Sequence, residues 1–158
     1  MIIDSLPIKT LLGDSISKED AIKKIIAANK DGYNIYIGTD SQKFTTHVSF
    51  VTSICLYKER EGGFGFFLKE KVIDPSLSVL RVRLLNEALR SIDAAITIQE
   101  LLPDAPLQIH LDVGIDIKRS KSAKYQTELV GLINAQGWEC KTKPDSWVIT
   151  MADRFTKS

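Results

Sequence analysis

The chain has few of the residues that mark secreted, disulfide-linked or membrane proteins. Its two cysteines, Cys55 and Cys140, stand far apart and form no C-x-x-C pair. Isolated thiols argue against a disulfide scaffold or a thiolate metal site, and they favour a reducing compartment. No apolar run approaches the roughly 18 residues of a membrane span, and the N-terminus lacks a basic-then-apolar signal pattern. We therefore expect a soluble cytoplasmic protein without a membrane partner.

Excess charge and a phosphate-binding loop are also missing. The 21 Lys and Arg residues stand against 20 Asp and Glu, a formal net charge of +1. A globally basic domain is the usual electrostatic sign of nucleic-acid binding, so any such site must be local. The pair Gly62-Gly63 lies in a charged, predicted hairpin turn and does not begin a helix, unlike the Gly-rich loops that hold nucleotide phosphates. These absences disfavour a nucleotide-handling enzyme on an α/β sheet.

What is present is the composition of an ordinary globular domain. The 158 residues are 44% hydrophobic and 26% charged, enough for one domain with a substantial core. Residues 1–14, with Pro7 and Gly13, are predicted to be irregular. A helix follows, beginning with a cap at Ser17 and ending near Gly32. We assign residues 1–32 to an N-terminal helical extension and 33–158 to the core of a single domain spanning 1–158.

Three strands are predicted at the start of the core. Residues 33–40 are rich in β-branched and aromatic side chains, and 46–58 alternate between two faces. Residues 64–73 form the third strand after the turn at 59–63. Their short connections favour antiparallel neighbours.

Helices and strands alternate in the rest of the chain. A long helix is predicted over residues 77–102, a strand over 107–114, a helix over 123–136, a strand over 138–142 and a short helix over 151–157. A strand reached through a long helix pairs in parallel with the first by a right-handed crossover. The expected fold class is α/β: a mixed sheet of three antiparallel and then two parallel strands, flanked by helices.

Four acidic residues fall where rigid elements present them. Asp40 ends the first predicted strand, Glu87 lies in the long helix, Asp112 stands at the end of the fourth strand, and Asp153 lies in the final helix. Ligands of α/β sheets bind outside the carboxyl ends of parallel strands, which places Asp40 and Asp112 together. Carboxylate oxygens are the ligands that Mg²⁺ prefers, and two such ions can hydrolyse a phosphodiester.

The order of these elements and acidic positions resembles the ribonuclease-H-like superfamily. The resemblance covers about residues 33–158. It rests on Asp40 in Ile-Gly-Thr-Asp-Ser, on Glu87, on Asp112 in His-Leu-Asp-Val-Gly, and on Asp153 in Ala-Asp-Arg-Phe-Thr-Lys. Within the superfamily the chain is most similar to the YkuK-like bacterial group, described as RNase-H-related predicted nucleases.

That resemblance implies a five-stranded mixed sheet and an Asp-Glu-Asp-Asp set holding two Mg²⁺ or Mn²⁺ ions with nucleic acid, whether RNA, DNA or hybrid. The chain departs from the better-known members in its added N-terminal helix. Glu87 is also well inside its predicted helix, and the chain has no aromatic, basic handle region for gripping a duplex.

Each candidate carboxylate also has a structural interpretation. Asp40 and Asp112 can each begin a turn, because Asp accepts hydrogen bonds from the backbone two residues on. Asp153 fits a capping box with Thr150 at a helix start. Glu87 is a common helix residue. The case for function therefore rests on the convergence of all four.

Basic residues and one histidine complete the candidate site. Lys118, Arg119 and Lys121 follow Asp112 directly and can contact phosphate, although charged runs are usually solvated loops. His110 shares a strand face with Asp112 and is either a substrate contact or a core histidine. The first hypothesis is a metal-dependent nuclease. The alternative is an inactive ribonuclease-H-like module that binds nucleic acid or protein, since a fold does not fix a function.

Overall fold

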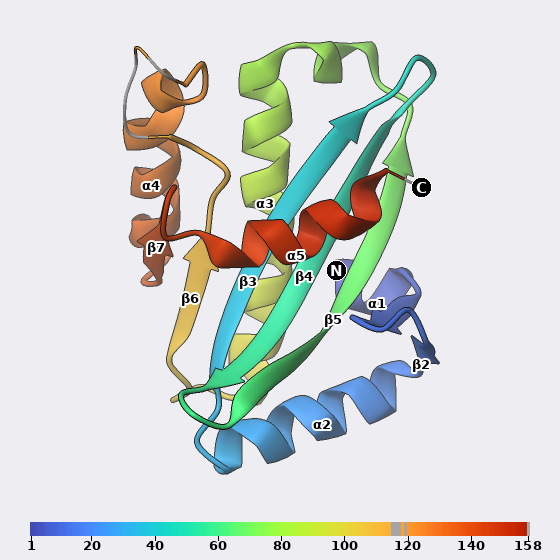
Figure 1. Cartoon of the computed structure of the whole chain (residues 1–158), viewed down its shortest axis with the longest axis vertical. Coiled ribbons are helices and arrows are strands. Elements are labelled where there is room, and N and C mark those ends of the chain that lie inside the picture. The colour runs from blue at the N-terminus through green and yellow to red at the C-terminus, as the bar shows by residue number, and fades with distance from the viewer. Residues whose placement is uncertain (115–117, 119, 158) are drawn as a thin grey trace.

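The computed structural model describes residues 1–114, 118 and 120–157, and it is shown in Figure 1. A mixed sheet is flanked by helices, as the fold-class prediction required. The elements in chain order are α1 (Ile2–Ser5), β1 (Ile8–Thr10), β2 (Ser15–Ile16), α2 (Lys18–Lys30), β3 (Asn34–Lys43), β4 (Val48–Lys58), β5 (Gly62–Val72), η1 (Pro75–Ser78), α3 (Leu80–Leu101), β6 (Leu107–His110), η2 (Ala123–Tyr125), α4 (Gln126–Ala135), β7 (Glu139–Lys141) and α5 (Trp147–Thr156).

The sheet has the predicted core topology. Its strand order is β2-β1-β5-β4-β3-β6-β7. Strands β3, β4 and β5 pair antiparallel, whereas β6 pairs in parallel with β3, and β7 in parallel with β6. The crossover through α3 therefore returns the chain beside β3, as the long helix in the sequence indicated.

Two strands at one edge of the sheet were missed. Residues 1–14 were expected to be irregular, but β1 pairs antiparallel with β5, and β2 pairs with β1. These strands contain 3 and 2 residues, too few for a periodic pattern to show. The N-terminal extension therefore adds a strand pair as well as the predicted helix, whose Ser17 hydroxyl accepts a hydrogen bond from the Asp20 amide at 3.1 Å.

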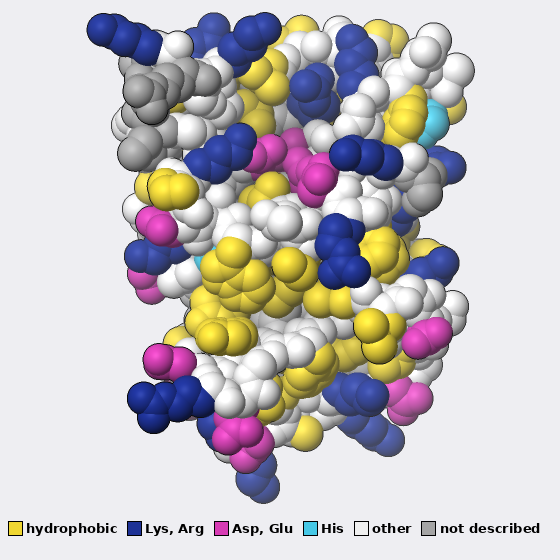
Figure 2. All heavy atoms as spheres, in the orientation of Figure 1, with side chains coloured by type: hydrophobic (Ala, Val, Ile, Leu, Met, Phe, Trp, Pro, Cys, Tyr) yellow, Lys and Arg dark blue, Asp and Glu magenta, His cyan; other side chains and the backbone are white. Residues whose placement is uncertain are grey.

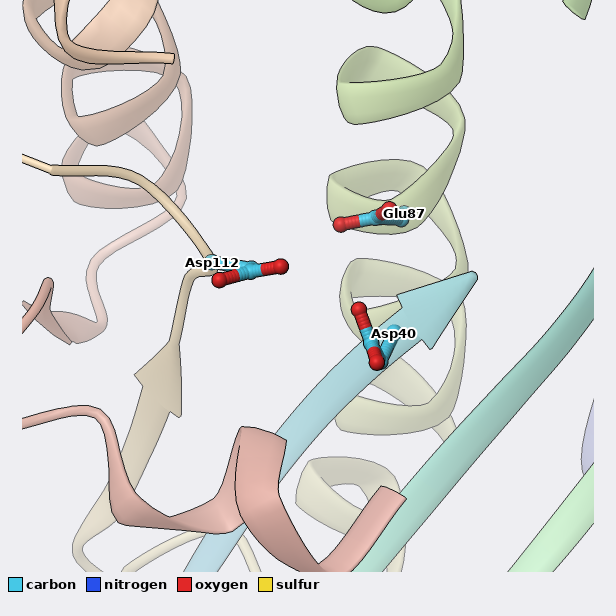
Figure 3. A group of neighbouring side chains, drawn as sticks. All are labelled: Asp40, Glu87 and Asp112. Atoms are coloured by element: carbon cyan, nitrogen blue, oxygen red, sulfur yellow. The ribbon is translucent and has the colours of Figure 1, made fainter. Parts of the chain in front are cut away.

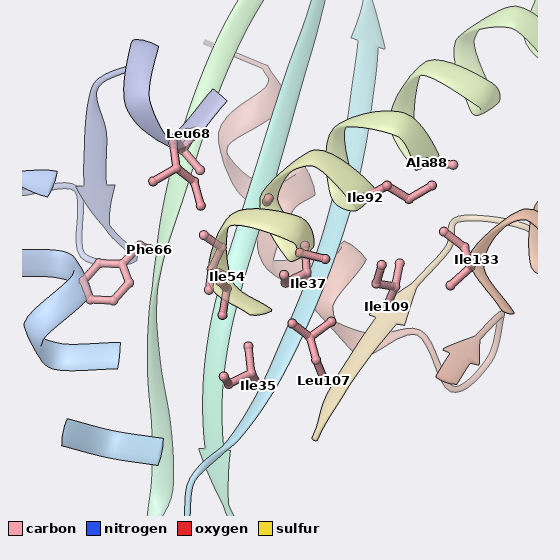
Figure 4. Close-up of a cluster of buried hydrophobic side chains, with 14 of the residues drawn as sticks. Ile35, Ile37, Ile54, Phe66, Leu68, Ala88, Ile92, Leu107, Ile109 and Ile133 are labelled. Carbon is pink, nitrogen blue, oxygen red and sulfur yellow. The ribbon is translucent and has the colours of Figure 1, made fainter. Parts of the chain in front are cut away.

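Both faces of the central strands are covered. All residues of β4 from Val48 to Leu56 are buried, so both faces of this strand are covered. Helices α2, α3 and α4 contribute to the main hydrophobic cluster on one face, which includes Ile37, Ile54 and Ile109 (Figure 4). On the other face α5 crosses β3, β4 and β5 (Figure 1), and its Ala152 packs with Val51 and Phe67. Each fully buried aliphatic side chain contributes roughly 1.5–3 kcal/mol to folding.

Three predicted boundaries were wrong, and each bears on the site. Strand β3 runs three residues past Asp40, so Asp40 lies inside a strand and not at its end. Strand β6 ends at His110, well before the predicted end at 114. Helix α5 begins at Trp147, so Thr150 and Asp153 lie inside it and form no capping box at a helix start. No helix in the described ranges has the length and apolarity needed to cross a membrane.

Candidate metal centre

The pairing of β3 with β6 brings Asp40 and Asp112 to the same level. Gly38 is the register partner of His110, and each aspartate stands two residues further along its own strand direction. Strand β3 continues while β6 has ended, which leaves the flank of β3 beside Asp40 without a partner strand. The segment after β6 stays extended, because the Leu111 amide donates to the Lys141 carbonyl at 2.9 Å. The two carboxylates thus converge by backbone register.

Hydrogen bonds to β3 fix the position of α3 and therefore of Glu87. The Thr39 hydroxyl lies 2.8 Å from the Ser91 hydroxyl of α3 and 3.0 Å from that of Thr52 on β4. Glu87 stands one turn before Ser91 and is buried. The Ser41 hydroxyl donates to Glu87 Oε2 at 2.6 Å. Glu87 is thereby aimed at the end of the sheet from a position about two turns inside α3, as its sequence position had indicated.

Asp40, Glu87 and Asp112 form one cluster of carboxylates (Figure 3), which we call the carboxylate cluster. One oxygen from each residue lies within 4.8 Å of the others. Asp153 is not part of that group, but its side chain hydrogen-bonds with Asp40 from α5. Gly38 permits this approach of α5, because a Cβ at position 38 would lie 3.1 Å from the side chains of Val148 and Ile149.

The carboxylate cluster cannot hold all of its negative charges without a cation. Burial, the charge of Asp112 and hydrogen bonds to Asp153 and Asp112 raise the pKa of Asp40 to about 8. Burial and the charge of Asp40 also hold the pKa of Glu87 well above its usual range, against the lowering effects of Ser41 and Arg83. Like charges brought this close disfavour ionisation. The cluster therefore carries bound protons at neutral pH that a cation would displace.

A small cleft with cationic side chains opens onto the carboxylate cluster. Its volume is about 250 Å³. Lys143 pairs with Asp112 across 2.8 Å between Nζ and Oδ1. The residues that line the cleft are Ser41, Leu80, Arg83, Leu84, Glu87, Asp112, Ser120, Lys121, Ser122 and Lys143. Negative charge at the base and positive charge at the rim suit a bound cation together with an anionic substrate.

The remaining predicted substrate residues occupy different surroundings. Lys121 is exposed and lines the cleft, and Lys118 is exposed outside it. Arg119 lies outside the described residues. His110 is fully buried: it accepts a hydrogen bond from the Val148 amide at Nδ1, 3.3 Å away, and its Nε2 lies 2.6 Å from Gln108 Oε1.

The surroundings of His110 match the core interpretation and not substrate contact. Burial, with a smaller effect from the charge of Lys141, lowers its pKa to about 4, so its imidazole is neutral at pH 7.

Three residues at the site were missed in the sequence. Ser41 directly follows Asp40, and a hydroxyl beside a carboxylate at a strand end was an available signal. Lys143 is distant in sequence from Asp112 and reaches it because the Lys143 amide donates to the Val113 carbonyl at 3.0 Å. Ser122 belongs to no recognisable sequence pattern. Its hydroxyl accepts a hydrogen bond from the Gly114 amide at 3.0 Å and so links Ser122 to the segment after Asp112.

The residues present fit a divalent ion with oxygen ligands. An octahedral Mg²⁺ with bonds of about 2.1 Å separates its ligand atoms by roughly 3–4 Å, close to the spacing of the carboxylate cluster. The described part of the cluster contains no thiolate or imidazole ligand, and hard carboxylates favour Mg²⁺ or Mn²⁺ over softer ions. The donor set thus supports the metal prediction by its chemistry.

Comparison with known proteins agrees with the fold. The family model described as Ribonuclease H-like matches residues 18–157. The "Uncharacterized protein YkuK" of Bacillus subtilis (strain 168) is 31% identical, and the alignment covers 81% of each chain. No solved structure matches the chain at a significant level. The matched region includes every strand of the core and all residues of the carboxylate cluster, and the chain belongs to the ribonuclease H-like family.

Proposed function

We propose that this protein is a nuclease that hydrolyses phosphodiester bonds of nucleic acid with divalent metal ions. The observation that carries the proposal is the carboxylate cluster, in which Asp40, Glu87 and Asp112 converge within 4.8 Å from three separate elements. Bringing three carboxylates together raises the pKa values of Asp40 and Glu87 and costs stability unless a cation compensates. Membership of the ribonuclease H-like family supports the same conclusion.

Each acidic residue has a separate role in the proposal. Asp40 and Asp112 hold the metal ions from two parallel segments, and Glu87 holds them from α3 with its orientation set by Ser41. Asp153 completes the set from α5, next to Asp40. When bound, Mg²⁺ or Mn²⁺ activates a water molecule and stabilises the leaving oxygen. Asp40 and Glu87 are buried and Asp112 is half-buried, which restricts their motion, so little reorganisation is needed on metal binding.

Cationic side chains at the rim position the substrate in this proposal. Lys121 lines the cleft and Lys143 contacts Asp112, so both stand where a phosphate next to the metal ions would lie. Lys143 neutralises Asp112 before metal binds and can turn to the phosphate afterwards. Phosphate contacts of this kind fix the position of a nucleic acid without reading its sequence.

Cleavage of labelled RNA, DNA and hybrid oligonucleotides tests the proposal. We expect hydrolysis with Mg²⁺ or Mn²⁺, none with EDTA, and a fall to background in Asp40→Asn and Asp112→Asn. Asp104→Asn, which changes an exposed loop carboxylate, is the matched control and should retain full activity. Full activity in either site variant would overturn the assignment. If the folded wild type binds oligonucleotides in EDTA and cleaves none, the inactive binding module is the better description.

A further inference from the structure

A second positively charged feature lies away from the carboxylate cluster. Lys9 of β1 and Lys69 and Lys71 of β5 line a groove of about 440 Å³, which we call the lysine groove. The floor includes Phe67, whose ring stacks on Phe155 of α5 with centroids 3.8 Å apart. Pro7 and Gly13 complete the described lining. This groove is built by the strand pair that the N-terminal extension adds to the sheet.

The sheet register places the three lysines on one face. Lys9 is the register partner of Phe67, and Lys69 and Lys71 follow Phe67 at intervals of two along β5. Residues two apart on a strand share a face, and register partners do too. Phe67 meets α5, so all three lysines lie on the face of the sheet that α5 crosses.

The lysine groove concentrates positive charge. Burial first, and then the charges of Lys71 and Lys9, lower the pKa of Lys69, as repulsion from neighbouring ammonium groups does. None of the described lining residues is acidic. Lys9 and Lys71 are exposed and therefore accessible to a ligand. A polyanion would relieve the repulsion and release its own counterions on binding.

The groove is aligned with the carboxylate cluster. Asp40 pairs with Val51 of β4, and Val51 pairs with Lys69 of β5, so the three residues form one row across the sheet. Two strand spacings amount to about 10 Å between the Cα atoms of Asp40 and Lys69. Figure 2 shows Asp and Glu side chains in the upper middle of this face, with Lys and Arg side chains on both sides of them.

We propose that the lysine groove binds the phosphate backbone of the nucleic acid whose cleaved bond is held at the carboxylate cluster. This inference rests on the proposed function for the identity of its ligand. Because Ala152 of α5 covers Val51 in the middle of this row, the nucleic acid passes over α5 between the cleft beside Asp112 and the β5–β1 edge. The stacked Phe67 and Phe155 form a rigid floor that keeps the lysines at the height of the passing backbone.

The test is fluorescence anisotropy with a labelled 16-nucleotide single-stranded RNA in EDTA, so that the probe stays uncut. Single-stranded DNA and a duplex of the same length are run beside it. The variant Lys9→Gln/Lys71→Gln removes two exposed charges from the groove. Lys23→Gln/Lys30→Gln, on exposed positions of α2 at the far end of the sheet (Figure 1), removes the same charge elsewhere. Thermal melting checks that both variants fold.

For the groove variant we expect about tenfold weaker binding at 100 mM salt. The slope of log K against log salt should also be shallower by about 1.5, or roughly 0.7 for each lost phosphate contact. A trinucleotide is too short to span from the carboxylate cluster to the groove, so its affinity should be nearly the same for the groove variant and the wild type. Equal loss in the α2 control, an unchanged slope, or no binding of any probe by the wild type would overturn the proposal.

Cleavage assays with Mg²⁺ or Mn²⁺ on the same variants, beside the binding measurements in EDTA, separate this inference from the proposed function. If wild type and groove variant bind and cleave equally well, the groove assignment fails while the nuclease stands. If binding in EDTA depends on Lys9 and Lys71 but no oligonucleotide is cleaved with Mg²⁺ or Mn²⁺, the groove stands and the nuclease fails.

Discussion

Removing one charge from the carboxylate cluster should stabilise the metal-free protein at alkaline pH. Burial and neighbouring carboxylates raise the pKa of Asp40 to about 8, against an ordinary value of 3.8. The folded state therefore holds a proton that the unfolded state has released. The stability associated with this proton is complete below about pH 4 and is lost as the pH rises through about 8. In Asp40→Asn the group no longer titrates, so this loss should vanish.

The size of this loss of stability follows from the pH range over which Asp40 titrates. Each pKa unit corresponds to about 1.4 kcal/mol. Between pH 6.5 and 8.5 the wild type should lose about 2 kcal/mol of unfolding free energy from Asp40 alone, since its proton is released near pH 8. The window begins at pH 6.5 because burial of His110 has the opposite effect at lower pH. Urea unfolding in EDTA at both pH values measures the difference.

The wild type, Asp40→Asn and Asp104→Asn should differ in how their stability depends on pH. We expect stability to fall by about 2 kcal/mol more in the wild type than in Asp40→Asn, because Glu87 titrates in both, and the control Asp104→Asn should fall as much as the wild type. Millimolar Mg²⁺ should restore wild-type stability at pH 8.5 through preferential binding to the folded state, but not that of Asp40→Asn. A wild type whose stability is flat across this window, or a variant that loses as much, would refute the electrostatic account of the cluster.

Three further predictions concern residues around the carboxylate cluster. Lys143→Gln removes the cation on Asp112 and should tighten Mn²⁺ binding about fivefold by calorimetry, because the exposed pair is worth about 1 kcal/mol; weaker binding would contradict the proposed competition. In the Asp40→Asn/Glu87→Gln background, which removes both buried carboxyl groups with raised pKa values, unfolding free energy should fall by about 2 kcal/mol from pH 7 to pH 5, since burial lowers the pKa of His110 to about 4; His110→Leu should abolish this dependence in the same urea titrations. Gly38→Ala puts a methyl group 3.1 Å from α5 side chains and should lower the free energy of unfolding by about 1–3 kcal/mol, measured as a lower melting temperature. An unchanged melting temperature would show that α5 can shift without loss of stability.

Sequence reasoning identified the fold because its long elements carry their own patterns. Residues 34–43 and 48–58 are long enough for β-branched and alternating side chains to show, and the 22-residue α3 implies the parallel crossover. Short elements carry no such signal, which is why β1 and β2 were missed. Helix α5 begins with Trp147-Val148-Ile149, residues of high β propensity, yet it is helical there, with the side chains of Val148 and Ile149 packed on Gly38.

Three of the four predicted acidic residues, Asp40, Glu87 and Asp112, lie together in the structure, but their environment could not be predicted. Asp40 was expected at a strand end because polar residues begin there. Strand β3 continues because Thr39 and Ser41 find hydrogen-bond partners on α3, which are tertiary contacts. Lys143 and the lysine groove depend on backbone register between distant segments. The catalytic and metal-binding roles of Asp40, Glu87, Asp112 and Asp153 stay predictions.

Calorimetric titration of Mn²⁺ into the protein at pH 7.5, with and without an uncleavable oligonucleotide, tests the central claim most directly. Buffers of different ionisation enthalpy report the protons released. We expect binding, strengthened by the oligonucleotide and accompanied by proton release, because the raised pKa of Asp40 means that metal must displace a proton. Asp40→Asn should abolish it, and Asp104→Asn should not. A folded wild type that binds no Mn²⁺ even with the oligonucleotide, or binding that survives in Asp40→Asn, would contradict the metal centre.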